Sequence, residues 1–321
     1  MKTSVALCTY NGEKFLGQQI DSILNQTVPV DEIVVCDDGS TDQTIPILNQ
    51  YLAKYPDIFK IYRNEKNLRS VKNFEKAISL CSNDVIFLSD QDDLWLPEKV
   101  ESYLHYFSRH PHVNVLCSNG YGIDENNEVL DVIAVWDLPK LIEEKEGSFD
   151  YFATLAFMSN FATGAAMAIR KNFLPEVIPF PIIKDFHHDE WIALVAAEKG
   201  KIGFLHEKLF KYREHSAQQV GGVFYENSER TRNGLISFLA FNNKKNSNFK
   251  YYKKILKRMS SAYKKHTALS EQCTTQKKIF ENIAAQAQQK YFELRKEAKR
   301  KYPLSFTALR IADHFSKKRK L

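Results

Sequence analysis

The stretch DVIFLSDQDDLW (residues 84–95) places three aspartates within four positions, directly after an apolar run. The run, residues 85–88, fits a short buried strand. Asp90, Asp92 and Asp93 therefore follow the end of a strand, where the chain leaves the core. Because neighbouring carboxylates repel one another, such a cluster is unstable as three bare charges and is typical of a site that takes up a cation.

The residues on either side of this stretch show a repeating pattern. Short apolar runs alternate with segments whose apolar residues have helical spacing. We expect strands at residues 3–9, 32–37, 58–63 and 84–88, and helices at residues 13–25, 42–54 and 70–81. This alternation predicts parallel strands joined by right-handed crossovers, with helices on both faces. The expected fold class is α/β, with a doubly wound, mostly parallel sheet.

Downstream of residue 95 the alternation is less regular. The pattern predicts a helix at residues 97–108, strands at 113–118 and 128–135, and a further helix at 185–199. From Glu229 onward the sequence is rich in Lys, favours helix and has no strand signal. We expect an α/β domain over residues 1–228 and a helical C-terminal region over residues 229–321.

These two parts differ in charge. The whole chain has a formal net charge of +6, but residues 229–321 contain 24 Lys and Arg against 6 Asp and Glu, a balance of +18. Residues 1–228 must then carry −12. An acidic domain and a basic region are expected to meet different partners.

The cysteines and the apolar segments bear on the compartment. Five cysteines lack a CxxC pair, which favours reduced, buried thiols over disulfides or zinc. The N-terminus has too short an apolar run for a signal peptide, so we expect a cytoplasmic protein. Residues 151–169 are uncharged over about the length that spans a bilayer. Their polar Ser159, Asn160 and Thr163 favour a buried segment of a soluble domain.

Polar side chains follow three of the expected strands: Thr9 to Asn11, Asp37 to Ser40, and Asp90 to Asp93. In such sheets ligands bind beyond the carboxyl ends of the strands. Clustered carboxylates suit Mg²⁺ or Mn²⁺, which keep coordination positions for water and substrate phosphate. A bound diphosphate is therefore implied. As an alternative, Asp92 and Asp93 cap the helix near Leu96.

Two phosphate-binding motifs are absent from the sequence, and their absence limits the classes of diphosphate ligand that we expect. It has neither the GxxxxGK[ST] of a P-loop nor a GxGxxG after the first strand. Asp38 could accept a hydrogen bond from the imide N–H of uracil or thymine. Equally, Asp38 could form the turn at Gly39-Ser40.

Three segments together carry a family resemblance: TYNGEKFLGQQIDSILNQT, EIVVCDDGSTDQT and FLSDQDDLWLPEKV. They resemble the nucleotide-binding half of family 2 glycosyltransferases, which have the GT-A fold, and the resemblance covers residues 1 to about 222. The SDQDD-LW form is similar to bacterial rhamnosyltransferases and related transferases of cell-surface polysaccharides. The resemblance implies an inverting enzyme that uses a nucleotide-activated sugar, with a nucleotide-sugar half (residues 1–110) and an acceptor half (111–228).

The resemblance also implies roles for single residues at the strand ends. The donor-binding residues would be Thr9, Asn11, Glu13, Asp38 and Asp90, with Thr9 and Asp38 near the base and Asp90 near the ribose or sugar. Asp92 would bind the divalent metal ion, Mg²⁺ or Mn²⁺.

The catalytic base is sought further along the chain, because inverting transfer needs one carboxylate to take the proton of the acceptor hydroxyl. DFHHDEW (residues 185–191) resembles the family's HDxW motif and makes Asp189 that base, with Glu190 next to it. An acid at a helix start can also simply favour the helix dipole. His187 and His188 lack the i, i+4 spacing expected of zinc ligands on a helix.

YREHSAQQVGG (residues 212–222) is similar to the family's YRxH segment, which closes over the diphosphate. Arg213 would bind phosphate oxygens, and His215 the metal or the phosphates. The family often has Asn where Ala217 and Gln218 stand. Residues 161–167 are small and apolar, and form either the acceptor side of the cleft or a tightly packed core segment.

The basic region interleaves lysines with aromatic residues, which suits an anionic membrane surface where lipid-linked acceptors are found. A solvated helical face or a dimerisation arm is the alternative. Nucleic acid is not an expected partner, because no recognised binding module is present. We expect a cytoplasmic enzyme, peripheral at the inner face of the plasma membrane.

For the donor, rhamnose from a dTDP sugar is the first expectation and a UDP-hexose or UDP-N-acetylhexosamine the alternative. The acceptor would be a glycan or a lipid-linked glycan. A nucleotidyltransferase should carry a glycine-rich, basic loop after its first strand, which CTYNGEKF does not provide. A non-catalytic nucleotide- or sugar-binding protein remains the alternative from another class.

Overall fold

The computed structural model describes residues 1–216, 218, 223–239, 248–316, 319 and 321. The chain forms two compact units. The first, here the sheet unit, contains residues 1–147 and 160–233, and the second, the helical unit, contains residues 148–159 and 234–321. The sequence placed a single boundary after residue 228. The structure differs because residues 148–159 group with the C-terminal helices.

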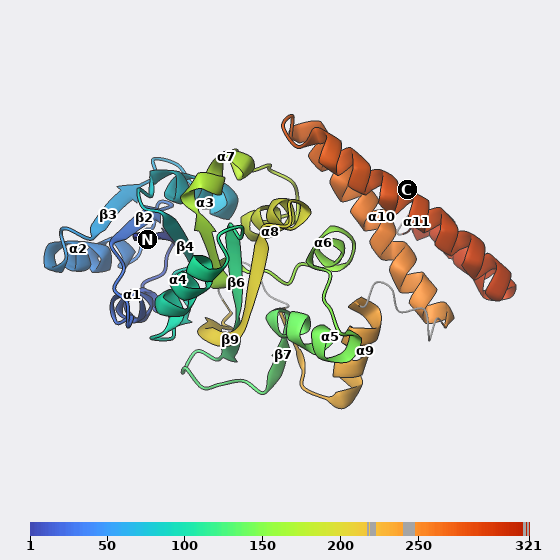
Figure 1. Ribbon diagram of the computed structural model, residues 1–321, viewed down its shortest axis with the longest axis horizontal. Coiled ribbons are helices and arrows are strands. Elements are labelled where there is room, and N and C mark those ends of the chain that lie inside the picture. Colours follow the sequence, from blue (N-terminus) through green and yellow to red (C-terminus); the bar gives the residue numbers. More distant parts are fainter. Residues whose placement is uncertain (217, 219–222, 240–247, 317–318, 320) are drawn as a thin grey trace. The chain divides into compact units, whose positions relative to one another are not determined.

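The sheet unit is built on an eight-stranded sheet with the order β3-β2-β1-β4-β8-β6-β9-β5 (Figure 1). Its first half is parallel and matches the predicted alternation of strands and helices. The strands of this half are β1 (Thr3–Thr9), β2 (Glu32–Asp37), β3 (Phe59–Arg63) and β4 (Val85–Ser89). In the parallel register Thr9 lies opposite Asp37, and Asp37 opposite Arg63, so their carboxyl ends share one edge.

The second half of the sheet is mixed. β8 (Met167–Arg170) runs antiparallel between β4 and β6 (Val115–Ile123). β9 (Ile202–Arg213) is parallel to β6, and the short β5 (Leu94–Trp95) pairs antiparallel with β9. The sequence predicted β6 but neither β8 nor β9. β8 lies inside a continuous uncharged segment, where periodicity cannot distinguish a buried strand from a buried helix.

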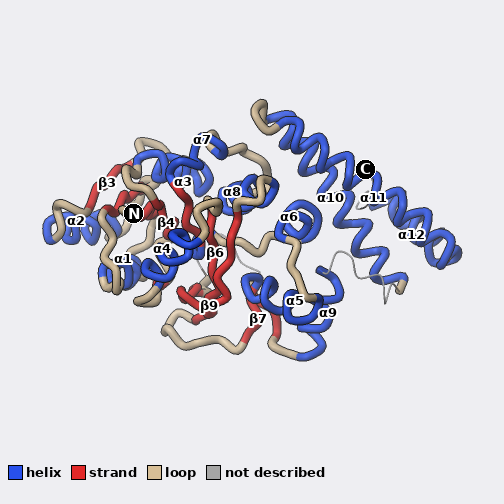
Figure 2. Tube along the Cα trace, in the orientation of Figure 1, coloured by secondary structure: helices blue, strands red, loops and turns tan. Residues whose placement is uncertain are grey.

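Helices cover both faces of the sheet, as predicted (Figure 2). One face packs against apolar residues of α1 (Leu16–Leu24), α2 (Thr44–Lys54) and α4 (Lys99–Arg109). On the other face lie α3 (Arg69–Leu80) and α8 (His188–Glu198). The sheet unit therefore has the three-layer α/β architecture that brings strand ends to one edge.

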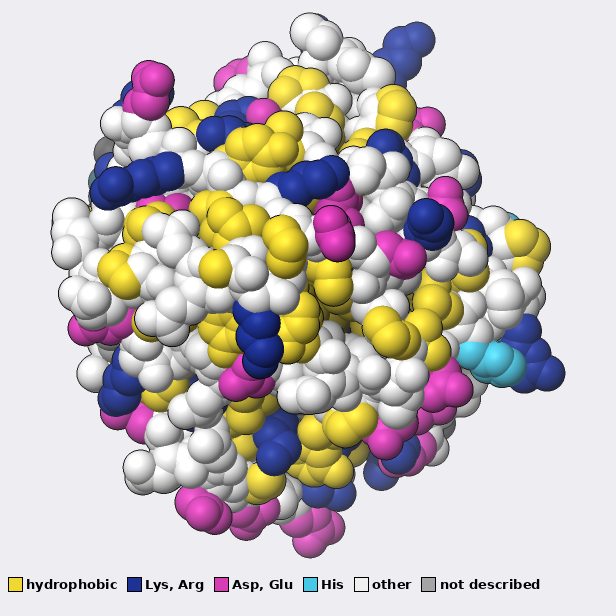
Figure 3. Space-filling model, turned by 90° about the vertical axis from the view of Figure 1, so that its left-hand side faces the viewer, with side chains coloured by type: hydrophobic (Ala, Val, Ile, Leu, Met, Phe, Trp, Pro, Cys, Tyr) yellow, Lys and Arg dark blue, Asp and Glu magenta, His cyan; other side chains and the backbone are white. Residues whose placement is uncertain are grey.

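Smaller elements complete the sheet unit. β7 (Val132–Ala134) pairs antiparallel with β10 (Phe224–Glu226), so the strand expected at residues 128–135 is shorter than predicted. The remaining short elements are η1 (Val135–Asp137), α5 (Leu138–Glu146), η3 (Gly164–Ala166), η4 (Lys171–Phe173) and α7 (Leu174–Val177). On the face at the left of Figure 1, acidic and basic side chains are interspersed (Figure 3).

The helical unit has no strand in its described residues, as the sequence predicted. It contains α6 (Tyr151–Ala153), η2 (Thr154–Met158), the end of α9 (Glu229–Leu239), α10 (Phe249–Gln272), α11 (Lys277–Lys301) and α12 (Pro303–Ser316). The ring of His266, buried in α10, lies with Nε2 2.8 Å from the carbonyl oxygen of Ala156. Contacts of this kind explain why part of the uncharged segment leaves the sheet unit.

The predictions for the cysteines and the long uncharged segment can be compared with the structure. All five cysteines are free and buried, as predicted. Residues 151–169 do not form one helix but pass through α6, η2, η3 and the start of β8. In the described part of the chain, every helix is too short or too polar to cross a membrane.

Candidate active site

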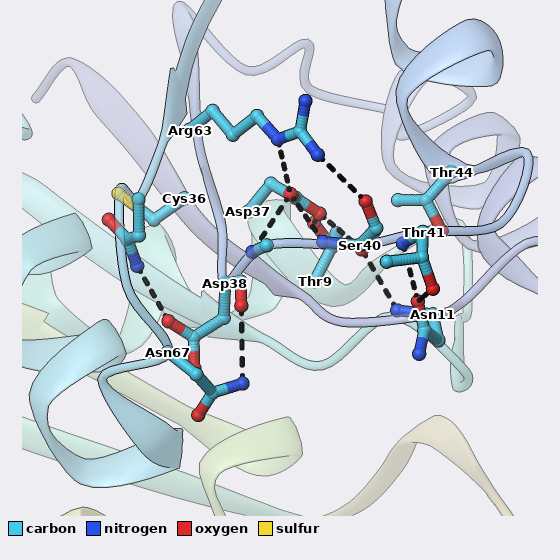
Figure 4. Close-up of polar contacts among 12 residues, drawn as sticks. Thr9, Asn11, Cys36, Asp37, Asp38, Ser40, Thr41, Thr44, Arg63 and Asn67 are labelled. Carbon is cyan, nitrogen blue, oxygen red and sulfur yellow. Dashed lines mark hydrogen bonds and ion pairs between the residues drawn. The ribbon is translucent and has the colours of Figure 1, made fainter.

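The turn after β2 is organised by Asp37, which is fully buried (Figure 4). Its Oδ1 accepts the backbone N–H groups of Gly39 (3.1 Å) and Ser40 (2.9 Å). Its Oδ2 accepts the hydroxyls of Thr9 (3.0 Å) and Ser40. Gly39 has φ +89°, a conformation that glycine adopts without steric cost. An aspartate at the end of the strand thus forms the turn at Gly39-Ser40, and it is Asp37, not Asp38.

Asp38 points instead toward the start of α3. Its carboxylate accepts hydrogen bonds from Asn64 Nδ2 (2.8 Å) and from the backbone N–H groups of Leu68 (2.7 Å) and Arg69 (2.8 Å). An open pocket of about 430 Å³, lined by Gly39, Arg63, Asn64 and Glu65, adjoins this carboxylate through Asn64. The helix start and Asn64 fix the carboxylate in one orientation beside the pocket.

Three other residues predicted to bind the sugar donor connect the end of β1 to the end of β2 by hydrogen bonds. The Thr9 hydroxyl bonds to Asp37, as described above. Asn11 Oδ1 accepts the N–H of Thr41 at 2.8 Å (Figure 4), and Glu13 Oε2 accepts the N–H of Gln43 at 2.8 Å. In the structure these side chains hold the loops of the site by hydrogen bonds. The sequence had assigned them to direct contact with the sugar donor.

The residues between β4 and β5, Asp90 to Asp93, form a loop that we call the acidic loop. It is held at both ends by hydrogen bonds. Gln91 makes two hydrogen bonds to the backbone of Tyr10, at 2.7 and 3.0 Å. Asp93 Oδ1 accepts the N–H of Arg213 at 3.0 Å, and Asp92 Oδ2 lies 2.9 Å from His215 Nε2. The next helix, α4, begins at Lys99 and neither aspartate caps it. The alternative that made these residues helix caps is wrong.

Arg213 supports the same loop from β9. Its side chain is buried, with Nε 2.8 Å from the carbonyl oxygen of Asp92 and Nη1 3.1 Å from that of Asp124. Nη2 donates to Gln18 at 3.3 Å, and the guanidinium lies 4.3 Å from the ring centre of Phe15. The guanidinium that the resemblance assigned to phosphate thus already has protein partners that hold the acidic loop.

Burial and mutual repulsion raise the pKa values of Asp90 and Asp93. Burial first, then the charges of Asp92 and Asp189, raises the pKa of Asp90 to about 8. Burial, then the charges of Asp92 and Asp90, raises the pKa of Asp93 well above its usual value, and its Oδ2 is buried without a hydrogen-bond partner. Without a cation, the loop therefore either takes up protons or keeps negative charges close together at a cost in free energy.

Lys99 is the buried cation nearest in sequence to this loop. Its Nζ donates to the carbonyl oxygen of Ala165 at 2.6 Å and lies 4.1 Å from the ring centre of Trp95. Burial lowers the pKa of Lys99 to about 7, whereas the negative charge of Asp93 opposes this shift. A lysine so buried offsets the acidic loop weakly, which leaves the loop suited to an added cation.

The residues present fit Mg²⁺ or Mn²⁺. Asp92 and His215 come from different segments and place an oxygen and a nitrogen 2.9 Å apart, and Asp93, the next residue after Asp92, has a buried Oδ2 without a hydrogen-bond partner. In the described residues, groups of three or more ligand-type side chains arranged around a common point are absent. Since Mg²⁺ usually takes one or two carboxylates and completes its shell with water and phosphate, a two-ligand protein site is sufficient.

Asp189 lies in the first turn of α8 and faces the same region. Its Oδ2 is 3.3 Å from the N–H of Gly164, and its Oδ1 2.6 Å from the N–H of Glu190. A Cβ atom on Gly164 would lie 3.7 Å from Asp90 Oδ2. The two carboxylates thus approach Gly164 together, and burial raises the pKa of Asp189 to about 6.

His188 forms a buried wall beside these carboxylates. Its ring stacks on Phe74 with the ring centres 4.0 Å apart, and neither ring nitrogen has a hydrogen-bond partner. Burial lowers the pKa of His188 to about 3, so the ring is neutral near pH 7. A Cβ on Gly164 would lie 3.0 Å from its Nε2, so a larger residue at 164 would require the ring to shift by a few tenths of an ångström.

Residues 161–167 belong to the packed core and also line the site. Their side chains are buried, but Gly164 presents its N–H to Asp189. Lys99 and the hydroxyl of Tyr103 fix the next two carbonyl groups, those of Ala165 and Ala166. Sequence reasoning missed Lys99, Gln91 and Asn64 as parts of the site. Lys99 and Gln91 lie within a quoted motif, where spacing alone could not assign them partners.

Part of the YRxH segment cannot be compared with the prediction. Ala217 and residues 219–222 lie outside the described residues.

Comparison with known proteins identifies the family. The model of "Glycosyl transferase family 2" matches residues 4–177, more than half of the chain. The chain belongs to glycosyltransferase family 2. The region that matches includes β1 to α7 and the acidic loop. The matched residues therefore form a glycosyltransferase family 2 domain.

Two curated relatives illustrate the similarity. The putative glycosyltransferase EpsE of Bacillus subtilis is 36% identical over 124 residues, which cover 39% of this chain and 45% of EpsE. The dTDP-rhamnosyl transferase RfbG of Shigella flexneri is 28% identical over 246 residues, 72% of this chain and 78% of RfbG. The match with EpsE thus spans less than half of that protein.

Two solved structures share the GT-A fold of this family 2 glycosyltransferase. Residues 1–349 of TarS from S. aureus, in complex with UDP-GlcNAc, match with a TM-score of 0.53 and 16% identity, over 94% of this chain and 92% of that one. The mannosyltransferase PcManGT from Pyrobaculum calidifontis, in complex with GDP-Man and Mn²⁺, matches with a TM-score of 0.52 and 14% identity, over 98% and 79%.

Proposed function

We propose that this protein is an inverting, divalent-metal-dependent glycosyltransferase, with Asp189 as the catalytic base and the acidic loop as the diphosphate end of the site. One observation carries the proposal. Asp189 and Asp90 come from segments about a hundred residues apart, and both carboxylates lie beside the backbone of Gly164. A sugar bound between them would have the leaving diphosphate on one side and the base on the other.

Asp189 is suited to general-base chemistry. In a single displacement the acceptor hydroxyl oxygen bonds to the anomeric carbon, the bond from that carbon to the phosphate oxygen breaks, and the hydroxyl proton passes to Asp189. A carboxylate with a pKa of about 6 is ionised at neutral pH and is a stronger base than an exposed aspartate. The N–H groups of Gly164 and Glu190 hold it in place during the transfer.

Asp92 and His215 would hold the metal ion, since their facing atoms lie 2.9 Å apart next to the under-compensated carboxylates. When bound, the ion would stabilise the negative charge on the departing diphosphate. Asp90, whose carboxylate approaches Gly164 as that of Asp189 does, would contact the ribose or the sugar. Arg213 would act by holding the loop through the carbonyl of Asp92.

For the nucleotide, Asp38 and the pocket beside Arg63 and Asn64 support a base-binding site. A carboxylate that accepts an imide N–H does not distinguish thymine from uracil. The similarity to RfbG, a dTDP-rhamnosyl transferase by name, favours dTDP-rhamnose as donor. The likeness to TarS in complex with UDP-GlcNAc keeps a UDP sugar as the second candidate.

For the acceptor, we propose a glycan or lipid-linked glycan of a cell-surface polysaccharide, reached from the cytoplasmic face of the membrane. In this proposal residues 1–228 carry the transferase activity, and the basic region, residues 229–321, associates with the membrane. The +18 charge balance of residues 229–321 supports attraction to anionic lipid.

The test is isothermal calorimetry of the full chain with dTDP-rhamnose, UDP-GlcNAc and UDP-galactose, each with Mn²⁺ and with EDTA. We expect dTDP-rhamnose to bind most tightly, and binding to weaken at least about tenfold in EDTA, because the diphosphate loses its counter-ion. Asp92→Asn should remove the Mn²⁺ dependence. The matched control, Asp57→Asn, changes an exposed aspartate in the turn before β3 and should bind as the unmodified protein. Donor binding that is indifferent to EDTA would refute the metal site.

A further inference from the structure

The C-terminal helix α12 has apolar residues on two opposite faces. Phe306 and Leu309 are buried at 5% and 7% exposure, and the cation of Arg295 in α11 lies 5.5 Å from the Phe306 ring centre. The hydroxyl of Tyr291 in α11 donates to the backbone carbonyl of Arg319, just after α12. One face of α12 therefore packs on α11, the helix that precedes it in the chain (Figure 2).

The opposite face is equally apolar but faces solvent. Leu304 is 87% exposed and Ile311 60% exposed, among the most exposed large apolar side chains described. Ala308 and Ala312 between and beside them are also exposed. At 3.6 residues per turn these positions form one stripe, about half a turn away from Phe306 and Leu309. We define this stripe, Leu304, Ala308, Ile311 and Ala312, as the outer stripe.

The sequence of α12 and its flanks is basic. Asp313, the acidic residue of α12, is paired with Arg319, and its side chain is 13% exposed. The run Lys299 to Lys301 just before α12 is exposed, and so is Arg310, which lies on the side of the helix away from the outer stripe. Residues 303–321 contain five Lys and Arg against one acidic residue, a balance of +4. A protein partner of ordinary mixed charge does not require this combination, whereas an anionic bilayer surface does.

We propose that α12 is the membrane-inserting element of this glycosyltransferase, with the outer stripe buried among the lipid chains and the neighbouring cations at the anionic headgroups. This inference rests on the proposed membrane association and states which residues carry it. Charge attraction alone would keep the basic region at the surface. Insertion of Leu304 and Ile311 adds an apolar contribution that salt does not screen.

Flotation of the full chain with liposomes of phosphatidylglycerol and phosphatidylcholine, compared with phosphatidylcholine alone, tests the proposal. We expect binding to the anionic liposomes, with a substantial fraction retained at raised salt. The double variant Leu304→Gln/Ile311→Gln should bind at least about tenfold more weakly, because two apolar side chains no longer enter the lipid. Glutamine is a good helix former and both side chains are exposed, so the fold should persist.

A matched control is available in the sheet unit. Val129 and Ile182 are 56% and 66% exposed, so Val129→Gln/Ile182→Gln replaces two exposed apolar side chains elsewhere, with a somewhat smaller loss of exposed apolar area. This control should bind liposomes as the unmodified protein does. Because the native cysteines are all buried, an Ile311→Cys variant can also be labelled selectively with an environment-sensitive dye. Its emission should shift to the blue on addition of anionic liposomes.

Each outcome separates this inference from the proposed function. If the unmodified chain binds anionic liposomes and the α12 double variant binds equally well, insertion by α12 is refuted while membrane association stands. If no liposome binding occurs, both membrane statements fail, and calorimetry with the donor still reports on the transferase site. If the double variant instead changes the oligomeric state in light scattering without changing liposome binding, the outer stripe contacts a second copy and the proposal is wrong.

Discussion

The turn after β2 and the acidic loop after β4 lie at the same edge of one sheet, yet their carboxylates are in opposite situations. Asp37 accepts four hydrogen bonds from Thr9, Gly39 and Ser40. Asp93 leaves one oxygen buried and unpaired, and Asp90 has its pKa raised to about 8 by burial and neighbouring charge. The first turn satisfies its carboxylate within the protein, whereas the acidic loop leaves one buried carboxylate oxygen without a partner.

This difference separates carboxylates that the protein satisfies fully from those that we propose take part in the reaction. A buried carboxylate with full hydrogen bonding stabilises a fold, and one without it costs free energy. Asp189 is intermediate, because it accepts two backbone N–H groups and yet burial raises its pKa to about 6. Three substitutions of aspartate by asparagine can break or sharpen the contrast.

The largest effect is expected for Asp189→Asn. The variant keeps the shape of the side chain but cannot take the acceptor proton, so kcat should fall by about 10³. Donor affinity should be unchanged, since Asp189 lies on the acceptor side of the proposed reaction. Initial rates and calorimetry measure the two quantities separately. Turnover equal to that of the unmodified protein would mean that Asp189 is not the base, and no turnover in either protein would favour non-catalytic binding.

The pH dependence supplies a control for this result. Asp189 must be ionised to act, and its pKa is raised to about 6, so the active form is present above that pH and is lost below it. We expect kcat/KM to fall about tenfold per pH unit below pH 6. Glu190→Gln, a neutralisation at the next position, should keep this acid limb. An acid limb near pH 4 would contradict the assignment of Asp189.

The second effect is on stability. Asp37→Asn replaces one accepting oxygen by a donor in a turn that offers Asp37 only donors, and should reduce the free energy of unfolding by about 3 kcal/mol. Urea denaturation measures it, with Asp57→Asn as the exposed control. A loss as small as that of the control would mean that the turn after β2 does not depend on this carboxylate.

The smallest effect has the opposite sign. Asp90→Asn replaces a carboxyl group that must either take up a proton or hold a charge near Asp92 and Asp189, and should stabilise the metal-free protein by about 1 kcal/mol. In EDTA its melting temperature should exceed that of the unmodified protein. With Mn²⁺ and donor the order should reverse, because the unmodified protein alone gains binding free energy. A lower melting temperature in EDTA would place Asp90 with the structural carboxylates.

Several features were fixed by local pattern and were predicted from the sequence. The first strands agree with the structure to within a residue or two, because short apolar runs between helical periods have few alternative conformations. Helix α1 begins at Leu16 and not at residue 13, since residues 13–15 form a turn that braces the site. The motifs also placed the carboxylates at strand ends, and the family model agrees with the resemblance they carried.

Only the tertiary structure decided which hydrogen-bond partners and which pKa values these residues have. Whether a carboxylate is satisfied depends on donors from distant segments, such as the N–H of Arg213 for Asp93 and that of Gly164 for Asp189. The same holds for Lys99, which looks like an exposed lysine of a helix start and is buried against Ala165. Sequence spacing specifies which groups reach the sheet edge. Their pKa values and partners follow from burial and long-range contacts, which no local pattern encodes.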